Sequence, residues 1–155
     1  SSSVPCEVVM ELSKQKALEV QEKIKEDEYI ILSADTIVAI GDVILGKPKD
    51  REDAFNMIKN IQGRTHSVYT GVTLIKNSKT NKKINTFFEE TKVNVYSMTD
   101  EEINDYLDKS IWKDKAGSYG IQGEFASYVK GIEGDYYTVV GLPISRVVYE
   151  LKQMN

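Results

Sequence analysis

Runs and alternations of apolar residues along the chain predict its strands. Apolar residues fill most of the segment YIILSADTIVAI, and such a run is typical of a strand buried on both faces. Gly41 and Asp42 then predict a tight hairpin turn. A second hairpin is expected around the polar turn NSKTNK. We therefore expect strands over Tyr29–Ile40, Val43–Leu45, Ser67–Lys76, Lys83–Tyr96, Ser127–Ile132 and Tyr136–Val140.

Helical periodicity and capping residues predict helices between these strands. Asp50 is a suitable N-cap residue for one helix, and Thr99 with Glu102 forms a capping box at the start of another. Pro143 favours the first turn of a last helix. We expect helices over Glu7–Glu26, Arg51–Ile61, Asp100–Leu107 and Pro143–Gln153. The order of elements predicts an α/β or α+β domain, a mixed β-sheet with helices on its faces.

The first helix carries a lysine among its apolar positions. Val9, Leu12, Val20 and Ile24 form its expected apolar stripe, and Lys16 lies one helical step after Leu12. Lys16 is therefore directed along the buried side. From the pattern alone, this residue is either a lysine whose stem covers the edge of the core or a cation at a binding site.

Composition narrows the possible classes of function. The chain has 155 residues, of which 41% are hydrophobic and 28% charged, as expected for one globular domain. Its net charge of −4 argues against a general nucleic-acid-binding surface. The opening SSSVPCEVVM lacks the pattern of a signal peptide, and no apolar run is long enough to span a membrane. The single cysteine, Cys6, favours a reducing compartment, so we expect a cytoplasmic protein.

Asp35 is the first candidate for chemistry, because it interrupts an apolar strand. A carboxylate at such a position is costly unless it is paired, bound to a metal or placed at a cavity wall. The alternative is an aspartate that accepts hydrogen bonds from backbone N–H groups at a strand end. Thr36 beside it either binds a substrate or merely suits the strand.

Two loops carry the other candidates. Lys47 lies between Gly46 and Pro48, and the stiff backbone before proline suits a lysine that holds an anion. The segment KAGSYGIQG has closely spaced glycines that allow a ligand to approach the backbone. Its Gln122 has an amide able to donate to and accept from a nucleobase edge. The alternative is a tight surface loop with a solvated glutamine.

Other patterns are less informative. His66 is the single histidine, which argues against a zinc site and favours a structural role at a strand start. Neither a Walker sequence nor GxGxxG occurs. Tyr136 and Tyr137 are expected to lie in the core and its rim rather than to form a stacking platform.

Taken together, five strings resemble the Maf family of nucleoside triphosphate pyrophosphatases. They are ADTIV, LGKPKD, GRTHSVYTGV, DKAGSYGIQG and IEGDYYTVVGLP, in the family's order, within roughly Leu12–Leu151. The resemblance implies one domain over residues 1–155, with an elongated mixed sheet and flanking helices, like the inosine triphosphate pyrophosphatase group. Family members begin with a strand, a loop of the type SASPRR and a helix, and we expect this segment to be missing from the chain.

The resemblance also implies an activity and a site. Family members cleave nucleoside triphosphates between the α and β phosphates, need a divalent cation such as Mg or Mn, and are often homodimers. By resemblance, Asp35 is the general base and a possible metal ligand, while Lys16 and Lys47 hold phosphates. Thr36 and Gln122 match positions linked to base selection, and GIQG resembles the branch that acts on dTTP and UTP. The expected partner is a nucleotide, with neither nucleic acid nor membrane.

Two other functions remain open at this point. An inactive relative would bind nucleotide as a sensor without turnover, a reading that the lack of an Arg-Arg pair favours and that Asp35, Lys16 and Lys47 oppose. A nucleic-acid-binding factor is the third possibility, and the net charge of −4 opposes it.

Overall fold

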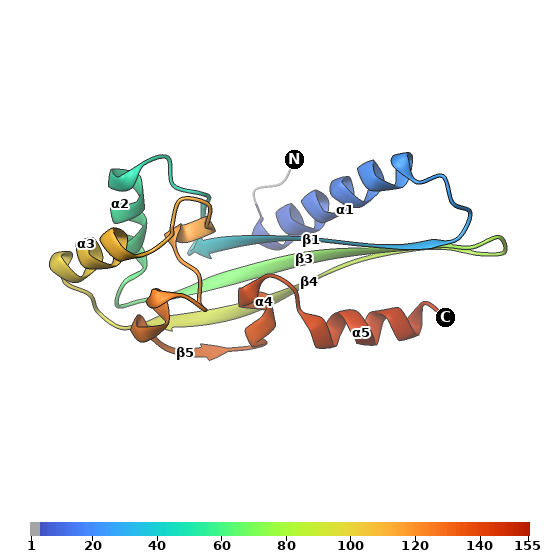
Figure 1. The fold of residues 1–155 in the computed structure, drawn as a ribbon. Helices are drawn as coiled ribbons and strands as arrows, with labels where there is room; N and C mark the ends of the chain where they lie inside the picture. The colour runs from blue at the N-terminus through green and yellow to red at the C-terminus, as the bar shows by residue number, and fades with distance from the viewer. Residues whose placement is uncertain (1–3) are drawn as a thin grey trace.

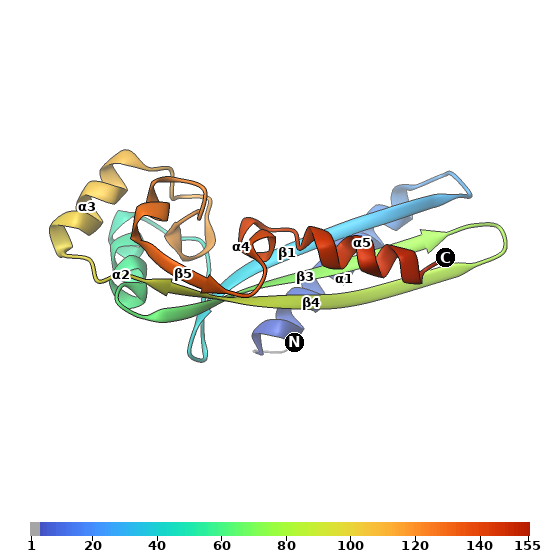
Figure 2. The same cartoon turned by 90° about the horizontal axis from the view of Figure 1, so that it is seen from below.

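A long sheet with helices on both faces forms the body of the molecule. The computed structural model describes residues 4–155. Its strands are β1 (Tyr29–Ile40), β2 (Val43–Leu45), β3 (Thr65–Asn77), β4 (Lys82–Val95) and β5 (Val129–Glu133). Its helices are α1 (Pro5–Lys23), α2 (Arg51–Ile61), α3 (Asp100–Lys109), α4 (Tyr136–Val140) and α5 (Ile144–Gln153). Helix α1 covers one face of the sheet and α5 the other, while α2 and α3 gather at one end (Figures 1 and 2).

The sheet has the strand order β2-β1-β3-β4-β5, and all of its pairings among residues 4–155 are antiparallel. The α/β fold with flanking helices is confirmed, but the expected mixture of parallel and antiparallel pairs is wrong for this part of the chain. The reason lies in α2, which returns the chain to the end of the sheet where β1 finished. Strand β3 therefore begins opposite the end of β1, with Ser67 facing Ala39, and runs back along it.

Most elements follow the predicted boundaries to within three residues at either end. The Asp50 cap is confirmed, because its side chain accepts a hydrogen bond from the backbone N–H of Asp53. The capping box of Thr99 and Glu102 is confirmed as well. These signals are local in sequence, so they do not depend on distant packing.

The predicted strand over Tyr136–Val140 is wrong, because this segment is the short helix α4. The Asp135 side chain accepts from the backbone N–H and the hydroxyl of Thr138, at 2.7 and 2.8 Å. Gly141, with φ at 131°, ends the helix. This cap and the glycine prevail over the strand preference of the sequence YYTVV.

Two expectations about burial are also corrected. Val38–Ile40 at the end of β1 are all buried and Ile31 is buried as well, whereas Ile30 and Leu32 are 58% and 48% exposed. Strand β2 pairs only with this end of β1, so among the described residues the earlier part of β1 is an outer edge. On α1 the buried residues are Val9, Ser13 and Ala17, whereas the predicted stripe members Leu12 and Val20 are exposed.

Small residues explain this change of face on α1. A Cβ atom at Gly71 of β3 would lie only 2.3 Å from the backbone oxygen of Val9, so the helix touches the sheet backbone there. Ser13 hydrogen-bonds Thr73 of β3 at 2.9 Å. Close approach of a helix to a strand requires a residue without a side chain where the two backbones meet, which is Gly71, and the small side chains of Ser13 and Ala17 continue the buried face of α1.

Apolar side chains form a large core at the end of the molecule that carries α2 and α3. Its fully buried members include Phe125, Ile58, Ile61 and Ile103. A smaller cluster lies between α5 and the sheet, around Val72, Leu74 and Phe87. The loop from Ser110 to Gly123 packs on the large core through Trp112, Tyr119 and Ile121. The core therefore holds this loop in a fixed position.

Candidate active site

Asp35 and Lys16 form an ion pair on the face of the sheet covered by α1. Lys16 Nζ donates to Asp35 Oδ1 at 2.7 Å. The Asp35 side chain is 22% exposed and that of Lys16 is 54% exposed, so both groups remain accessible to a ligand. The close packing of α1 on Gly71 sets the position of Lys16 relative to β1. The structure therefore brings together the two charged residues that the sequence singled out, and it favours a paired aspartate.

Thr36 lies on the opposite face, because successive side chains of a strand alternate between faces. Its Oγ1 hydrogen-bonds Thr70 Oγ1 at 2.7 Å, and Thr70 donates to the backbone oxygen of Thr138 in α4 at 2.8 Å. Thr36 and Lys47 line a cavity of about 250 Å³ on this face. The structure places these two residues together, and it separates them from Asp35 and Lys16 by the thickness of β1.

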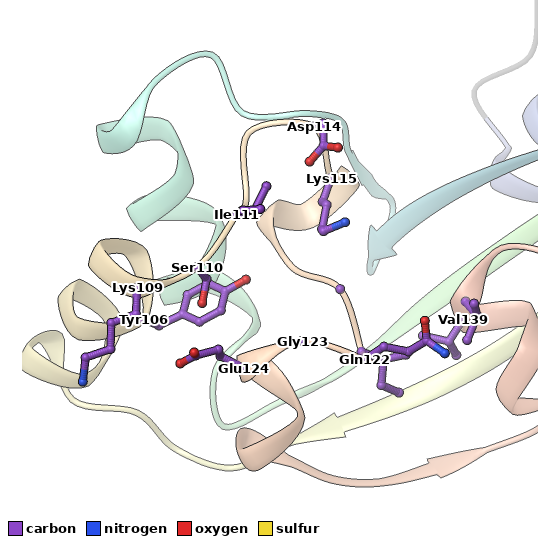
Figure 3. Close-up of a pocket in the computed structure, with 13 residues that line it drawn as sticks. Tyr106, Lys109, Ser110, Ile111, Asp114, Lys115, Gln122, Gly123, Glu124 and Val139 are labelled. Atoms are coloured by element: carbon purple, nitrogen blue, oxygen red, sulfur yellow. The ribbon is translucent and has the colours of Figure 1, made fainter.

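A second, wider cavity of about 590 Å³ adjoins the first and is lined by Gln122. Figure 3 shows Gln122 and Lys115 on the two arms of the loop that lines it. The two cavities have one wall in common and are together called the cleft, with Lys47 lining the narrow cavity and Gln122 the wide one. The shared wall consists of Asp114, Lys115, Gly120, Ile121, Val139 and Val140.

The loop that forms this wall is held by hydrogen bonds from several elements. The backbone N–H of Gly117 donates to the carbonyl oxygen of Gly46 at 3.1 Å, which ties the loop to the segment carrying Lys47. Tyr106 Oη donates to the backbone oxygen of buried Ser118 at 2.8 Å. Gly117 and Ser118 both have positive φ, 70° and 71°, so neighbouring structure maintains an unfavourable backbone at Ser118.

His66 anchors the same loop from β3. Its Nε2 lies 2.6 Å from Tyr119 Oη, and the two rings meet edge to face with centroids 5.4 Å apart. The imidazole is only 2% exposed, and burial lowers the pKa of His66 to about 4. A neutral, buried imidazole suits the structural role expected for this residue. Burial also raises the pKa of the Tyr119 phenol.

Sequence reasoning missed three residues of this cleft. Tyr106 and Tyr119 hold the loop, and Lys115 lines both cavities. The signal for Tyr119 and Lys115 was present in KAGSYGIQG, where a tyrosine and a lysine stand among glycines that leave room around them. Tyr106 gave no such signal, because it lies in α3 and meets the loop through the fold.

The residues described by the structure fit a divalent cation that arrives with the substrate. No group of three or more His, Cys, Asp or Glu side chains in residues 4–155 is arranged to hold a metal ion. Mg²⁺ commonly binds through one or two carboxylates together with substrate phosphates. Asp35 offers one such carboxylate, since Lys16 occupies only its Oδ1.

No helix within residues 4–155 is long and apolar enough to cross a membrane.

Comparison with known proteins identifies the family of this chain. A family model described as Maf-like protein matches residues 1–154. A dTTP/UTP pyrophosphatase of Thermoanaerobacter sp. (strain X514) is 52% identical over 99% of this chain and 78% of its own length. Proteins with the same name from Agathobacter rectalis and Bacillus thuringiensis subsp. konkukian are 47% and 50% identical, over 97% and 99% of this chain and 80% and 77% of their own lengths. With a family model and half-identical relatives both covering nearly all of its residues, the chain belongs to the Maf family.

Proposed function

We propose that this protein hydrolyses dTTP and UTP between the α and β phosphates, giving the monophosphate and pyrophosphate. The observation that supports it most is the pairing of an accessible carboxylate with a cation-lined cleft, in a chain about half identical to dTTP/UTP pyrophosphatases. The two parts flank one short stretch of β1, at Asp35 and Thr36. Because β2 pairs only from Val38 onward, β1 has no outer neighbouring strand at Asp35 and Thr36 among the described residues, and we propose that the phosphate chain passes this edge to reach Asp35.

In the proposed mechanism, Asp35 is the general base. Its carboxylate accepts a proton from a water molecule, and the water oxygen attacks the α phosphorus. The bond from this phosphorus to the bridging oxygen breaks, and pyrophosphate leaves with the electron pair. A positioned base of this kind contributes typically about 10²- to 10⁴-fold to the rate.

Lys16 and Lys47 hold the phosphates in this mechanism. Lys16 is paired with Asp35, and an incoming phosphate offers it a second anionic partner beside the base. Lys47 is exposed at the narrow cavity, where it stabilises the negative charge of the leaving group. A divalent cation, Mg or Mn, supplies further neutralisation of phosphate charge when bound, and Asp35 is the residue we propose to hold it.

Thr36 and Gln122 are proposed to select the nucleotide. The wider cavity around Gln122 offers about 590 Å³, enough for a base and its sugar. The exposed Gln122 amide can donate and accept, which suits the mixed edge of uracil or thymine. Thr36 is held by Thr70, so its hydroxyl has a fixed direction on the wall of the narrow cavity.

Substitution of Asp35 by asparagine tests this function. Asp35→Asn keeps the side chain nearly the same size but removes the base, so we expect pyrophosphate release to fall at least about 100-fold. Asp42→Asn makes the same exchange in the exposed β1–β2 turn and serves as the matched control. Pyrophosphate release is measured from dTTP, UTP, CTP, methylated GTP and ITP with Mg or Mn. Nucleotide binding without release by the unsubstituted protein would instead identify a non-catalytic nucleotide-binding relative.

Two further parts of the proposal concern the protein as a whole. We propose a homodimer, which light scattering after size-exclusion chromatography measures directly. We propose a cytoplasmic location, supported by the single cysteine of the sequence. Fractionation of cells that produce the protein tests the location.

A further inference from the structure

One cation of the cleft has no place in the mechanism above. Lys115 lines both cavities, between Lys47 in the narrow one and Gln122 in the wide one. Its backbone belongs to the loop that Tyr106 and His66 hold by hydrogen bonds. The Cα atom from which the side chain extends therefore has a fixed position. We propose that Lys115 binds the α phosphate of the nucleotide, as a third lysine beside Lys16 and Lys47; this rests on the proposed function.

The Lys115 side chain lies against Gly120, which lines both cavities. A Cβ atom at Gly120 would lie 3.1 Å from both Cδ and Cε of Lys115 and 3.6 Å from its Nζ. The stem of the lysine therefore lies along the bare backbone of Gly120. A glycine at this place leaves the space that the stem occupies, and the ammonium ends at the shared wall.

The charge of the narrow cavity favours an anion there. Two lysines, Lys47 and Lys115, line it together with a single acidic residue, Asp114. Within the described chain, none of these three side chains forms a salt bridge. Lys109, which lines the wide cavity, is by contrast paired with Asp105 at 3.0 Å. A half-buried ammonium without a carboxylate partner gains most from a ligand that brings negative charge.

Phosphate and base are the two parts of a nucleotide that Lys115 can reach from this wall. The shared cavity with Lys47 favours the phosphate, because two cations around a small space both gain from one anion. A hydrogen bond to a base carbonyl would use the donor but leave the charge uncompensated. Truncated ligands distinguish a contact to the phosphate from a contact to the base, because uridine keeps the base and sugar of UMP but lacks the phosphate.

The test compares Lys115→Met with the unsubstituted protein in calorimetric or NMR titrations with UMP and with uridine. Methionine keeps the length and the apolar stem but removes the charge. We expect the affinity for UMP to fall about 10- to 100-fold, the usual effect of losing one charge-assisted hydrogen bond. We expect the affinity for uridine to stay within about twofold, since hydrogen bonds to the base are untouched.

Two controls make the result specific. Lys113→Met removes a lysine two positions away that lines neither cavity, and we expect it to bind both ligands normally. Lys115→Arg retains the charge, so we expect it to recover most of the affinity for UMP. Equal weakening of UMP and uridine by Lys115→Met, or no change in either, would overturn the assignment to phosphate.

The failure of this inference differs from the failure of the proposed function. These titrations use a product and a fragment and need no turnover. If the unsubstituted protein releases no pyrophosphate yet Lys115→Met selectively loses UMP, the catalytic proposal fails and the phosphate contact stands. If pyrophosphate is released but Lys115→Met binds UMP normally, the phosphate contact fails and the catalytic proposal stands.

Discussion

The two faces of β1 carry two differently built halves of the proposed site. On the α1 face, Asp35 and Lys16 depend on one helix crossing the sheet at Gly71. On the opposite face, the cleft depends on a loop held by hydrogen bonds from three separate elements, at Gly46, His66 and Tyr106. The difference indicates that the proposed base is positioned by regular secondary structure, whereas the proposed nucleotide-binding cleft is positioned by an anchored loop. Damage to one half is therefore expected to leave the other largely intact.

The largest effect is expected from Gly71→Ala, which attacks the α1 face. The new Cβ would lie 2.3 Å from the backbone oxygen of Val9, so α1 must move away from β3. We expect a loss of about 3 kcal/mol or more in the free energy of unfolding, as for severe overpacking. Lys16 moves with the helix, so pyrophosphate release should also fall in the fraction that remains folded. Urea denaturation and activity assays measure the two effects.

Gly131→Ala is the matched control for this prediction. Gly131 lies in β5 with no atom within 4 Å of the position of its added Cβ. We expect a change in the free energy of unfolding of less than about 0.5 kcal/mol, as for most surface substitutions. Equal effects of the two substitutions would contradict the close contact of α1 with Gly71.

The next effect concerns pH and the opposite face. The pKa of His66 is about 4 in the folded protein, below the value of 6.5 for an unperturbed histidine. Between these values the unfolded chain binds a proton that the folded chain does not, so stability must fall as the pH drops from 6.5 towards 4. The shift corresponds to about 3 kcal/mol in the free energy of unfolding, fully present above pH 6.5.

His66→Gln isolates this contribution, because glutamine does not titrate. Urea denaturation at pH 7, 6, 5 and 4.5 gives the change in stability with pH for both proteins, and carboxylates contribute equally to each. We expect a markedly shallower decline in the variant. Parallel declines in the two proteins would show that the imidazole is not held neutral by burial.

The smallest effect is expected from Tyr106→Phe, which removes one anchor of the loop. Phenylalanine keeps the ring contact with Phe125 but loses the hydrogen bond to the Ser118 carbonyl oxygen. We expect a loss of about 1 to 3 kcal/mol in the free energy of unfolding, because a buried acceptor is left unpaired. The apparent KM for dTTP should rise while the rate at saturation changes little. A reduced rate at saturation with an unchanged KM would contradict the separation of the two halves.

Sequence reasoning predicted those parts of the fold that depend on local signals. The bounds of β1 and the caps at Asp50 and Thr99 follow from residues next to one another. It failed where packing across the sheet decides, as for Leu12, which is exposed because small residues bring α1 close to Gly71. It also failed at α4, where the Asp135 cap prevails over strand-forming residues.

The candidate site shows the same limit. Asp35 stood out because a carboxylate interrupts an apolar strand, and Lys47 because a stiff loop carries it. That Asp35 and Thr36 serve opposite faces follows from strand alternation, but the distribution of Lys16, Lys47 and Gln122 between those faces required the three-dimensional arrangement. Lys115 belongs to the wall that both cavities share, a position that only the three-dimensional structure shows.

Single-turnover release of pyrophosphate from dTTP is the decisive experiment on Asp35 as the base in nucleotide hydrolysis. We expect release by the unsubstituted protein and by Asp42→Asn. For Asp35→Asn we expect a rate at least about 100-fold lower with dTMP binding retained. Release by Asp35→Asn at the unsubstituted rate would show that Asp35 is not the base.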